Sequence, residues 1–162
     1  MKPIPAEVLL VDDNPGDLEL TSEFLSRNHY PHRIHTAGDA DEAIAFIRGT
    51  GKYARVDRPD LIVLDLNLPR KPGHTVLSAV KQDANLQGVP VVIFSTSQAP
   101  ADISRSYQLG ANSYVCKPGN LADFAMAVIT MGNFWLCCAS LDGSSKAKRH
   151  EDVPVIPYKE NA

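Results

Sequence analysis

The chain has 162 residues, of which 44% are hydrophobic and 22% charged, and this composition is ordinary for one globular domain with its own core. Its net charge of −3 gives no general attraction to nucleic acid or to an anionic membrane. No apolar run approaches the roughly 20 residues of a membrane span, and the N-terminus MKPIPAEVLL lacks the apolar core of a signal peptide.

Short apolar runs alternate with helix-like stretches along the first part of the chain. EVLLV (7–11) has the composition of a strand, and the Asp-Asp-Asn-Pro that follows it (12–15) favours the start of a helix. HRIHTA (32–37) is a weaker strand candidate. The next helix is predicted to begin near Asp39, because Asp39 and Glu42 have the spacing of a capping box.

A polar, glycine-containing loop (49–59) follows, and the same alternation then continues three more times. The predicted strands are 61–65, 91–95 and 113–116, and the predicted helices begin near Gly73, Pro100 and Asn120. Five strand–helix units predict an α/β domain with a doubly wound parallel sheet. The nearly continuous apolar runs indicate strands that are covered on both faces.

We expect residues 1–141 to form one domain with an extended C-terminal segment. From residue 142 onward the chain is polar, charged and proline-containing, so residues 142–162 are interpreted as a flexible tail. The basic run KAKRH (146–150) in this tail is followed by two acidic residues, which favours a solvated tail over a nucleic acid site. The cysteines are Cys116 and the adjacent pair 137–138, which argues against a disulfide framework and favours the cytoplasm.

Polar side chains stand where the predicted strands end. Asp12 and Asp13 follow the first strand, Asp65 ends the third, Ser95 ends the fourth and Lys117 follows the fifth. Ligands of doubly wound sheets bind outside the carboxyl ends of the strands, where the winding direction reverses. We therefore expect three carboxylates, one hydroxyl and one ammonium group to converge in a single crevice.

Carboxylates that are clustered in this way repel each other unless a cation lies among them. Oxygen ligands suit Mg²⁺, which keeps several waters and uses one or two carboxylates together with a substrate phosphate. Asp13 and Asp65 fit direct ligands, Asp12 would act through water, and Asn67 could add its backbone carbonyl. The sequence therefore predicts a magnesium site at this edge.

An aspartate beside Mg²⁺ can attack phosphorus and form an acyl phosphate. Lys117 would then neutralise phosphoryl oxygens, and Ser95 would donate a hydrogen bond to one of them. Catalysis of this kind consists mainly of positioning and charge neutralisation.

Four motifs together resemble the receiver domain of bacterial two-component response regulators. They are VDD (11–13), LDLNLP (64–69), the hydroxyl in FST (94–96) and YVCKP (114–118), and their order and spacing match over residues 6–136. The resemblance implies a flavodoxin-like receiver fold, a five-stranded parallel sheet of order 2-1-3-4-5. It also implies a phosphorelay protein that catalyses only its own phosphorylation and dephosphorylation and is not otherwise an enzyme.

The resemblance assigns roles to particular residues. Asp65 is the expected phosphoacceptor, which takes a phosphoryl group from a sensor histidine kinase, while Asp12 and Asp13 hold Mg²⁺. Lys117 is expected to contact the phosphoryl group, and its peptide bond to Pro118 is expected to be cis. Ser95 and Tyr114 match the switch pair that follows the phosphoryl group.

Residues 51–73 and the later FWL (134–136) resemble more narrowly the single-domain response regulators that partner phytochrome kinases in cyanobacteria. Such proteins have no DNA-binding output domain, and some dimerise through their C-terminal part. The resemblance thus implies a phytochrome-like kinase, a homodimer and a downstream protein whose identity the sequence does not give. Two departures are Pro72, where an acidic residue is usual, and Gly119, where an apolar residue is usual.

The segment 129–141 is apolar on several sides if it is helical, whereas a helix that lies on one core needs only one apolar stripe. Met131, Trp135 and Cys138 would form one stripe, and Phe134 would lie on another. We predict a dimer or partner surface that includes Phe134, Trp135 and Leu136. The alternative is that this end of the chain folds back on its own domain.

Other interpretations of the same residues stay open. Asp12 and Asp13 could simply cap the first helix and bind no metal. Asp65 could simply form a structural ion pair with Lys117. Thr96 is the alternative to Ser95 if the register is shifted by one residue. Tyr114 could be a packing residue.

Asn67 and Ser97 lie two residues beyond Asp65 and Ser95, so they could tune the access of hydrolytic water or be plain surface residues. The five histidines show no metal spacing and are interpreted as surface or strand residues. Two rival functions are an aspartyl phosphatase and an interaction module that works without phosphorylation. Asn67 argues against the phosphatase, because such enzymes place an acid/base Asp at that position.

Overall fold

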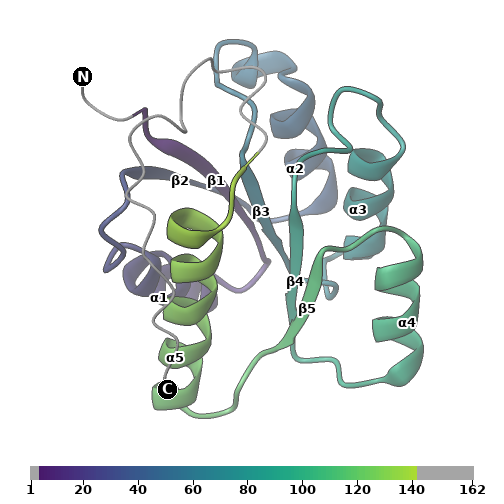
Figure 1. Cartoon of the computed structure of the whole chain (residues 1–162). Coiled ribbons are helices and arrows are strands. Elements are labelled where there is room, and N and C mark those ends of the chain that lie inside the picture. The colour runs from purple at the N-terminus through teal and green to yellow at the C-terminus, as the bar shows by residue number, and fades with distance from the viewer. Residues whose placement is uncertain (1–3, 142–162) are drawn as a thin grey trace, which may run out of the picture.

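Five parallel strands form the centre of the molecule in the computed structural model, which describes residues 4–141 (Figure 1). The strands are β1 (Ala6–Val11), β2 (His32–Ala37), β3 (Leu61–Leu64), β4 (Val91–Ser95) and β5 (Ser113–Cys116). Their order in the sheet is β2-β1-β3-β4-β5, and every neighbouring pair is parallel. The predicted strands and the sheet order are confirmed, while the predicted tail at 142–162 lies outside the described residues.

Helices cover both faces of this sheet. They are α1 (Pro15–Leu25), α2 (Ala40–Arg48), α3 (Gly73–Lys81), α4 (Pro100–Gln108) and α5 (Leu121–Gly132), with a short 3-10 helix, η1 (Gly51–Tyr53), in the loop after α2. In Figure 1, α1 and α5 lie side by side on one face, and α2, α3 and α4 lie on the other. The chain thus has the doubly wound architecture that the strand–helix alternation predicts.

The core is divided between the two faces because successive side chains of a strand point in opposite directions. In β1, Leu9 and Val11 join the cluster under α2 and α3, whereas Val8 and Leu10 join the cluster under α1 and α5. Every residue of β1, β3 and β4 is buried. Burial of these strands on both faces was predicted from their continuous apolar runs.

Side-chain caps fix where the helices begin. The side chains of Asn14, Asp39 and Asn120 accept hydrogen bonds from backbone N–H groups in the first turns of α1, α2 and α5. The predicted capping box is modified, because the Glu42 carboxylate accepts from the N–H of Gly38, one residue before the cap. Each cap satisfies an N–H group that would otherwise have no partner within the helix.

The last helix continues beyond its regular end. A wider turn, η2 (Asn133–Cys138), follows α5 directly, and the N–H of Ala139 donates to the carbonyl of Phe134. Among the described residues, only the stretch Leu121–Cys138 is long and apolar enough to pass for a membrane span by length and composition. Its buried side chains pack in the core cluster beside α1, as in a helix of a folded domain; these are Phe124, Val128, Met131 and Leu136.

Helix α4 has one buried residue, Ser106, and this residue is polar. The Oγ of Ser106 donates to the carbonyl of Asp102 at 2.7 Å and lies 3.0 Å from the Nε2 of His74 in α3. The interpretation of His74 as a surface or strand residue is therefore wrong, since His74 is buried in α3. Burial, the main cause, lowers the pKa of His74 and favours its neutral form, because a buried charge would lose its hydration.

Gly73 allows the first turn of α3 to approach the end of β3. Its N–H donates to the carbonyl of Leu66 at 2.9 Å, and a Cβ atom at this position would lie 2.2 Å from the backbone oxygen of Asp65. Only a residue without a side chain fits this approach. The position of α3 is thus coupled to the backbone of Asp65.

We predict that Gly73→Ala destabilises the fold by about 2 kcal/mol or more, because backbone atoms must move to accept the new methyl group. The matched variant is Gly119→Ala, whose Cβ would meet nothing within 4 Å. Urea unfolding of both variants measures the two free energies. Equal stability of Gly73→Ala and the wild type would contradict the close approach.

Candidate functional site

The carboxyl edge of the sheet fixes the backbone of the predicted site. The hydrogen bonds of the sheet continue one residue beyond three strands: Asp12 N–H donates to Ala37, Asp65 N–H to Val11, and Lys117 N–H to Ser95. The three donor–acceptor distances are 3.0, 2.9 and 2.8 Å. These side chains therefore start from rigid positions on three strands, as the sequence predicts.

The ammonium group of Lys117 joins the carboxylates. Its Nζ lies 2.6 Å from Asp12 Oδ2 and 2.9 Å from Asp65 Oδ2, and all three side chains are at most 9% exposed. The second oxygen of each aspartate accepts a backbone N–H from two residues further on, Asn14 for Asp12 and Asn67 for Asp65. In both aspartates, Oδ1 accepts the backbone N–H and Oδ2 accepts from Lys117.

Asp17 is a site residue that was not identified from the sequence. It lies in the first turn of α1, and its Oδ2 accepts a hydrogen bond from Lys117 Nζ at 2.9 Å. The sequence did contain a signal for Asp17. The helix that follows β1 must begin at the same edge of the sheet as Asp12, so an acidic residue in its first turn could have been placed near Lys117.

Burial and hydrogen bonding compete in setting the charges of this cluster. Burial disfavours the charged form of Lys117, but its hydrogen bonds with Asp12, Asp17 and Asp65 outweigh burial and raise its pKa. Burial is also the main cause that raises the pKa of Asp12, and the hydrogen bonds from Lys117 and from the Asn14 N–H offset it in part. One ammonium thus faces more acidic groups than it can neutralise.

A hard divalent cation fits the remaining acidic charge. Oxygen atoms of Asp12, Asp13 and Asp65 all lie within 4.8 Å of one another, and Asp13 is exposed, so a hydrated ion can approach from solvent. Carboxylate oxygens are the ligands that Mg²⁺ and Mn²⁺ prefer. These three residues form an acidic metal site, whereas the backbone carbonyl of Asn67 stays a predicted ligand.

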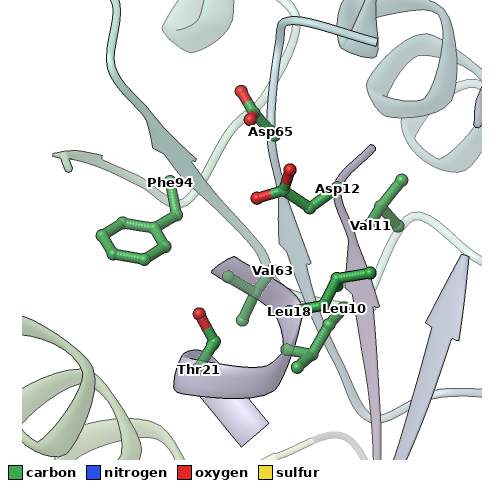
Figure 2. Close-up of a pocket in the computed structure, with 8 residues that line it drawn as sticks. All are labelled: Leu10, Val11, Asp12, Leu18, Thr21, Val63, Asp65 and Phe94. Carbon is green, nitrogen blue, oxygen red and sulfur yellow. The ribbon is translucent and has the colours of Figure 1, made fainter. Parts of the chain in front are cut away.

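A small pocket extends from the acidic cluster toward the core (Figure 2). Its empty volume is about 200 Å³, including some open solvent, and it is lined by Leu10, Val11, Asp12, Leu18, Thr21, Val63, Asp65 and Phe94. Figure 2 shows the carboxylates of Asp12 and Asp65 close together, with Val63, Leu18 and Leu10 below them in this view. The apolar floor strengthens interactions between charges, since little water can screen them.

The hydroxyl groups after β4 lie in two different environments. Ser95 is fully buried, and its Oγ accepts the N–H of Ser97 at 3.3 Å. Thr96 is exposed, and its Oγ1 lies 3.4 Å from the Nδ2 of Asn67. The hydroxyl of Tyr114 donates to the carbonyl of Ser97 at 2.8 Å. This loop therefore connects β4, β5 and the segment after Asp65.

The expectation that the peptide bond between Lys117 and Pro118 is cis is wrong. No peptide bond within residues 4–141 is cis. The trans form is the ordinary preference of a proline peptide bond, by about 0.5–1 kcal/mol. With this backbone, the Lys117 side chain still reaches Asp12, Asp17 and Asp65.

The three residues predicted for a partner surface have different environments. Phe134 is 54% exposed, Trp135 is half-buried with its ring 5.0 Å from that of Phe134, and Leu136 is buried in the core. The wider turn after α5 turns Leu136 inward, so Leu136 does not belong to an exposed surface. The same end also contacts the segment after α1, where Asn28 donates to Asn133 at 3.0 Å.

Comparison with known proteins relates the chain to one family. Residues 8–129 match the response regulator receiver domain. The chain is 39% identical over 132 residues to the response regulator Rcp1 of Synechocystis sp., a match that covers 82% of this chain and 90% of Rcp1. The crystal structure of Mn²⁺-bound Rcp1 has a TM-score of 0.82 and covers 85% of this chain and 99% of that one.

Two further solved structures are similar. The phosphorylated cyanobacterial phytochrome response regulator RcpA is 42% identical with a TM-score of 0.83, covering 86% of this chain and 99% of RcpA. The response regulator RPA3017 in red light signaling of R. palustris is 30% identical with a TM-score of 0.76, covering 85% of this chain and 98% of that one.

We predict that Mg²⁺ or Mn²⁺ stabilises the protein, by about 1.4 kcal/mol at ten times the dissociation constant of the ion. Asp13→Asn should reduce this gain, because it removes one carboxylate of the metal site. Glu19→Gln is the matched control, since it removes one exposed charge from α1. Thermal unfolding with and without the ion measures the effect, and an equal gain in both variants would rule against the site.

Proposed function

The chain belongs to the response regulator receiver domain family, and on that basis we propose that it is a single-domain response regulator whose phosphoacceptor is Asp65. The observation that carries the assignment of Asp65 is the buried contact between its carboxylate and Lys117 at the edge of the sheet, beside Asp12 and Asp13. Asp65 follows a buried strand, so its carboxylate is held rigidly for attack.

The transfer begins with a phosphohistidine of a sensor histidine kinase. An oxygen of Asp65 bonds to phosphorus, the bond from phosphorus to the imidazole nitrogen breaks, and that nitrogen keeps the electron pair. Asp12, Asp13 and Asp65 would hold a divalent cation, which we take to be Mg²⁺, and this ion would supply positive charge to the phosphoryl oxygens. Lys117 donates hydrogen bonds to the same group, and Ser95 donates one from the end of β4.

The phosphorylated state is relayed by a shift between two conformations. Ser95 and Tyr114 are the proposed switch pair. The hydroxyl of Tyr114 binds the carbonyl of Ser97, and the Ser97 hydroxyl donates to Asp102 of α4. Movement of the loop after β4 would therefore reach α4, which has few buried residues to hold it. Ser97 and Asn67 would also tune the access of hydrolytic water to the acyl phosphate.

The similarity to RcpA, a phytochrome response regulator, supports a phytochrome-type histidine kinase as the phosphodonor. The three cysteines of the chain are free thiols in the structure, which suits the reducing cytoplasm in which we place the protein. The phosphorylated form would act on a downstream protein, for which the mostly exposed side chains of α4 offer a contact surface.

We predict one phosphoryl adduct when the protein is incubated with Mg²⁺ and acetyl phosphate, or with a phosphorylated phytochrome-type kinase. Intact-mass measurement should show that the adduct requires Asp65, so that Asp65→Asn forms none while the control Asp123→Asn forms it normally. Omission of Mg²⁺ should also prevent it. An adduct on Asp65→Asn would refute the assignment, and no adduct from either donor would favour the interaction module instead.

We further propose that the protein forms a homodimer through its C-terminal helix. Large apolar side chains are exposed along it, with Leu121 at 60%, Met126 at 65% and Phe134 at 54%. Only 28% of the apolar stretch Leu121–Cys138 is buried within the domain. Phe134 and the half-buried Trp135 lie together, with ring centroids 5.0 Å apart, and a contiguous exposed apolar patch is typical of a protein contact.

Phe134→Asp should shift the protein from dimer to monomer in sedimentation experiments at high micromolar concentration. The comparison variant is Tyr107→Asp, which changes the large exposed apolar residue of α4. It should leave the dimer intact. If only Tyr107→Asp dissociates the dimer, the interface lies on α4 instead. A wild-type protein that is monomeric in both phosphorylation states would refute the dimer.

A further inference from the structure

Lys117 has three carboxylate partners, and its ammonium group has three hydrogens to donate. Its Nζ donates to Asp12 at 2.6 Å, to Asp65 at 2.9 Å and to Asp17 at 2.9 Å. An ammonium group has three donors and no acceptor, so all of its hydrogen-bonding capacity is used. To bind a phosphoryl oxygen, Lys117 must release at least one of these three carboxylates.

The three partners differ in what happens to them during the reaction. Asp65 becomes an acyl phosphate, and Asp12 belongs to the metal site. Asp17 lies on α1, and it is neither the attacking carboxylate nor one of the three residues of the metal site. It is therefore the partner of Lys117 that neither the phosphoryl group nor the cation displaces.

We propose that Asp17 is a positioning residue for phosphoryl transfer, a role that deepens the proposed function and rests on it. Asp17 keeps its hydrogen bond from the Lys117 ammonium. The other two N–H donors of Lys117 turn from Asp12 and Asp65 to the phosphoryl oxygens. It thereby draws Lys117 away from the carboxylates that must receive the cation and attack phosphorus.

The local structure supports this role. The backbone N–H of Asp17 donates to the capping side chain of Asn14, so the residue is fixed in the first turn of α1. The positive end of the helix dipole stabilises a carboxylate at this place. The Asp17 side chain is 27% exposed, compared with 9% for Asp12 and 7% for Asp65, so its charge remains partly hydrated.

Loss of Asp17 should leave Lys117 paired with Asp12 and Asp65 alone. Lys117 would then compete more strongly with the cation and cover the attacking oxygen. We expect Asp17→Ala to slow adduct formation at saturating Mg²⁺ and acetyl phosphate by about tenfold, with the adduct still on Asp65. Asp17→Glu should recover part of the rate, because it restores a carboxylate.

The experiment compares the rate of adduct formation with the affinity for Mn²⁺, measured by calorimetry on the full chain. Asp17→Ala should bind Mn²⁺ several-fold more weakly, while Glu19→Gln, which also loses one acidic charge from α1, should stay close to the wild type. In a Lys117→Met background, Asp17→Ala should have no further effect on either quantity if it acts through Lys117.

Each outcome bears on Asp17 separately from the proposed function. Wild-type rate and Mn²⁺ affinity in Asp17→Ala would overturn the role, as would an equal loss in the Lys117→Met background. A lower unfolding temperature with an unchanged rate constant would assign Asp17 a structural role only, which also overturns it. If the wild type forms no adduct, the proposed function fails, and the Mn²⁺ comparison still decides whether Asp17 acts through Lys117.

Discussion

The buried ammonium of Lys117 is the interaction on which this site depends. It connects the ends of three strands and the first turn of α1 through its contacts with Asp12, Asp65 and Asp17. Without it, the carboxylates would repel each other in an environment that water screens poorly. Because one positive charge does not neutralise the cluster, the same arrangement attracts a divalent cation and the phosphoryl chemistry that accompanies it.

The rest of the fold holds this cluster in place and leaves another part free to respond. The strands β1, β3 and β4 are buried throughout, and Gly73 brings α3 against the backbone of Asp65. In contrast, α4 has one buried residue, and the hydroxyl of Ser97 in the loop after β4 donates a hydrogen bond to its Asp102. A rigid reacting centre beside a weakly held helix is what a phosphorylation-dependent switch requires, since small changes at the centre can then move a surface.

The sequence was sufficient for features that depend on local pattern. Apolar runs predicted the strands, and caps such as Asn14 and Asp39 predicted where helices begin. Asp12, Asp65 and Lys117 could be brought together because parallel strands end at the same edge. The order of the sheet came from the resemblance to receiver domains, since strand–helix alternation alone allows several orders.

Features that depend on packing between helices were missed or wrong. Asp17 reaches Lys117 through a contact between the first turn of α1 and the residue after β5, and His74 is buried where α3 packs against Ser106 of α4. Leu136 was predicted as part of a partner surface, because the segment 129–141 is apolar on several sides if it is helical. The wider turn η2 instead gives a spacing of five residues between Met131 and Leu136, and both are buried.

A crystal structure with Mg²⁺ and beryllofluoride, a mimic of the acyl phosphate, would test the proposed reacting centre directly. Beryllium should be bonded to an oxygen of Asp65, with the ion held by Asp12, Asp13 and Asp65. The Nζ of Lys117 should have left Asp12 and should lie within hydrogen-bonding distance of both a fluorine atom and Asp17. Beryllium on another carboxylate, or Lys117 still bridging Asp12 and Asp65, would contradict this description of the site.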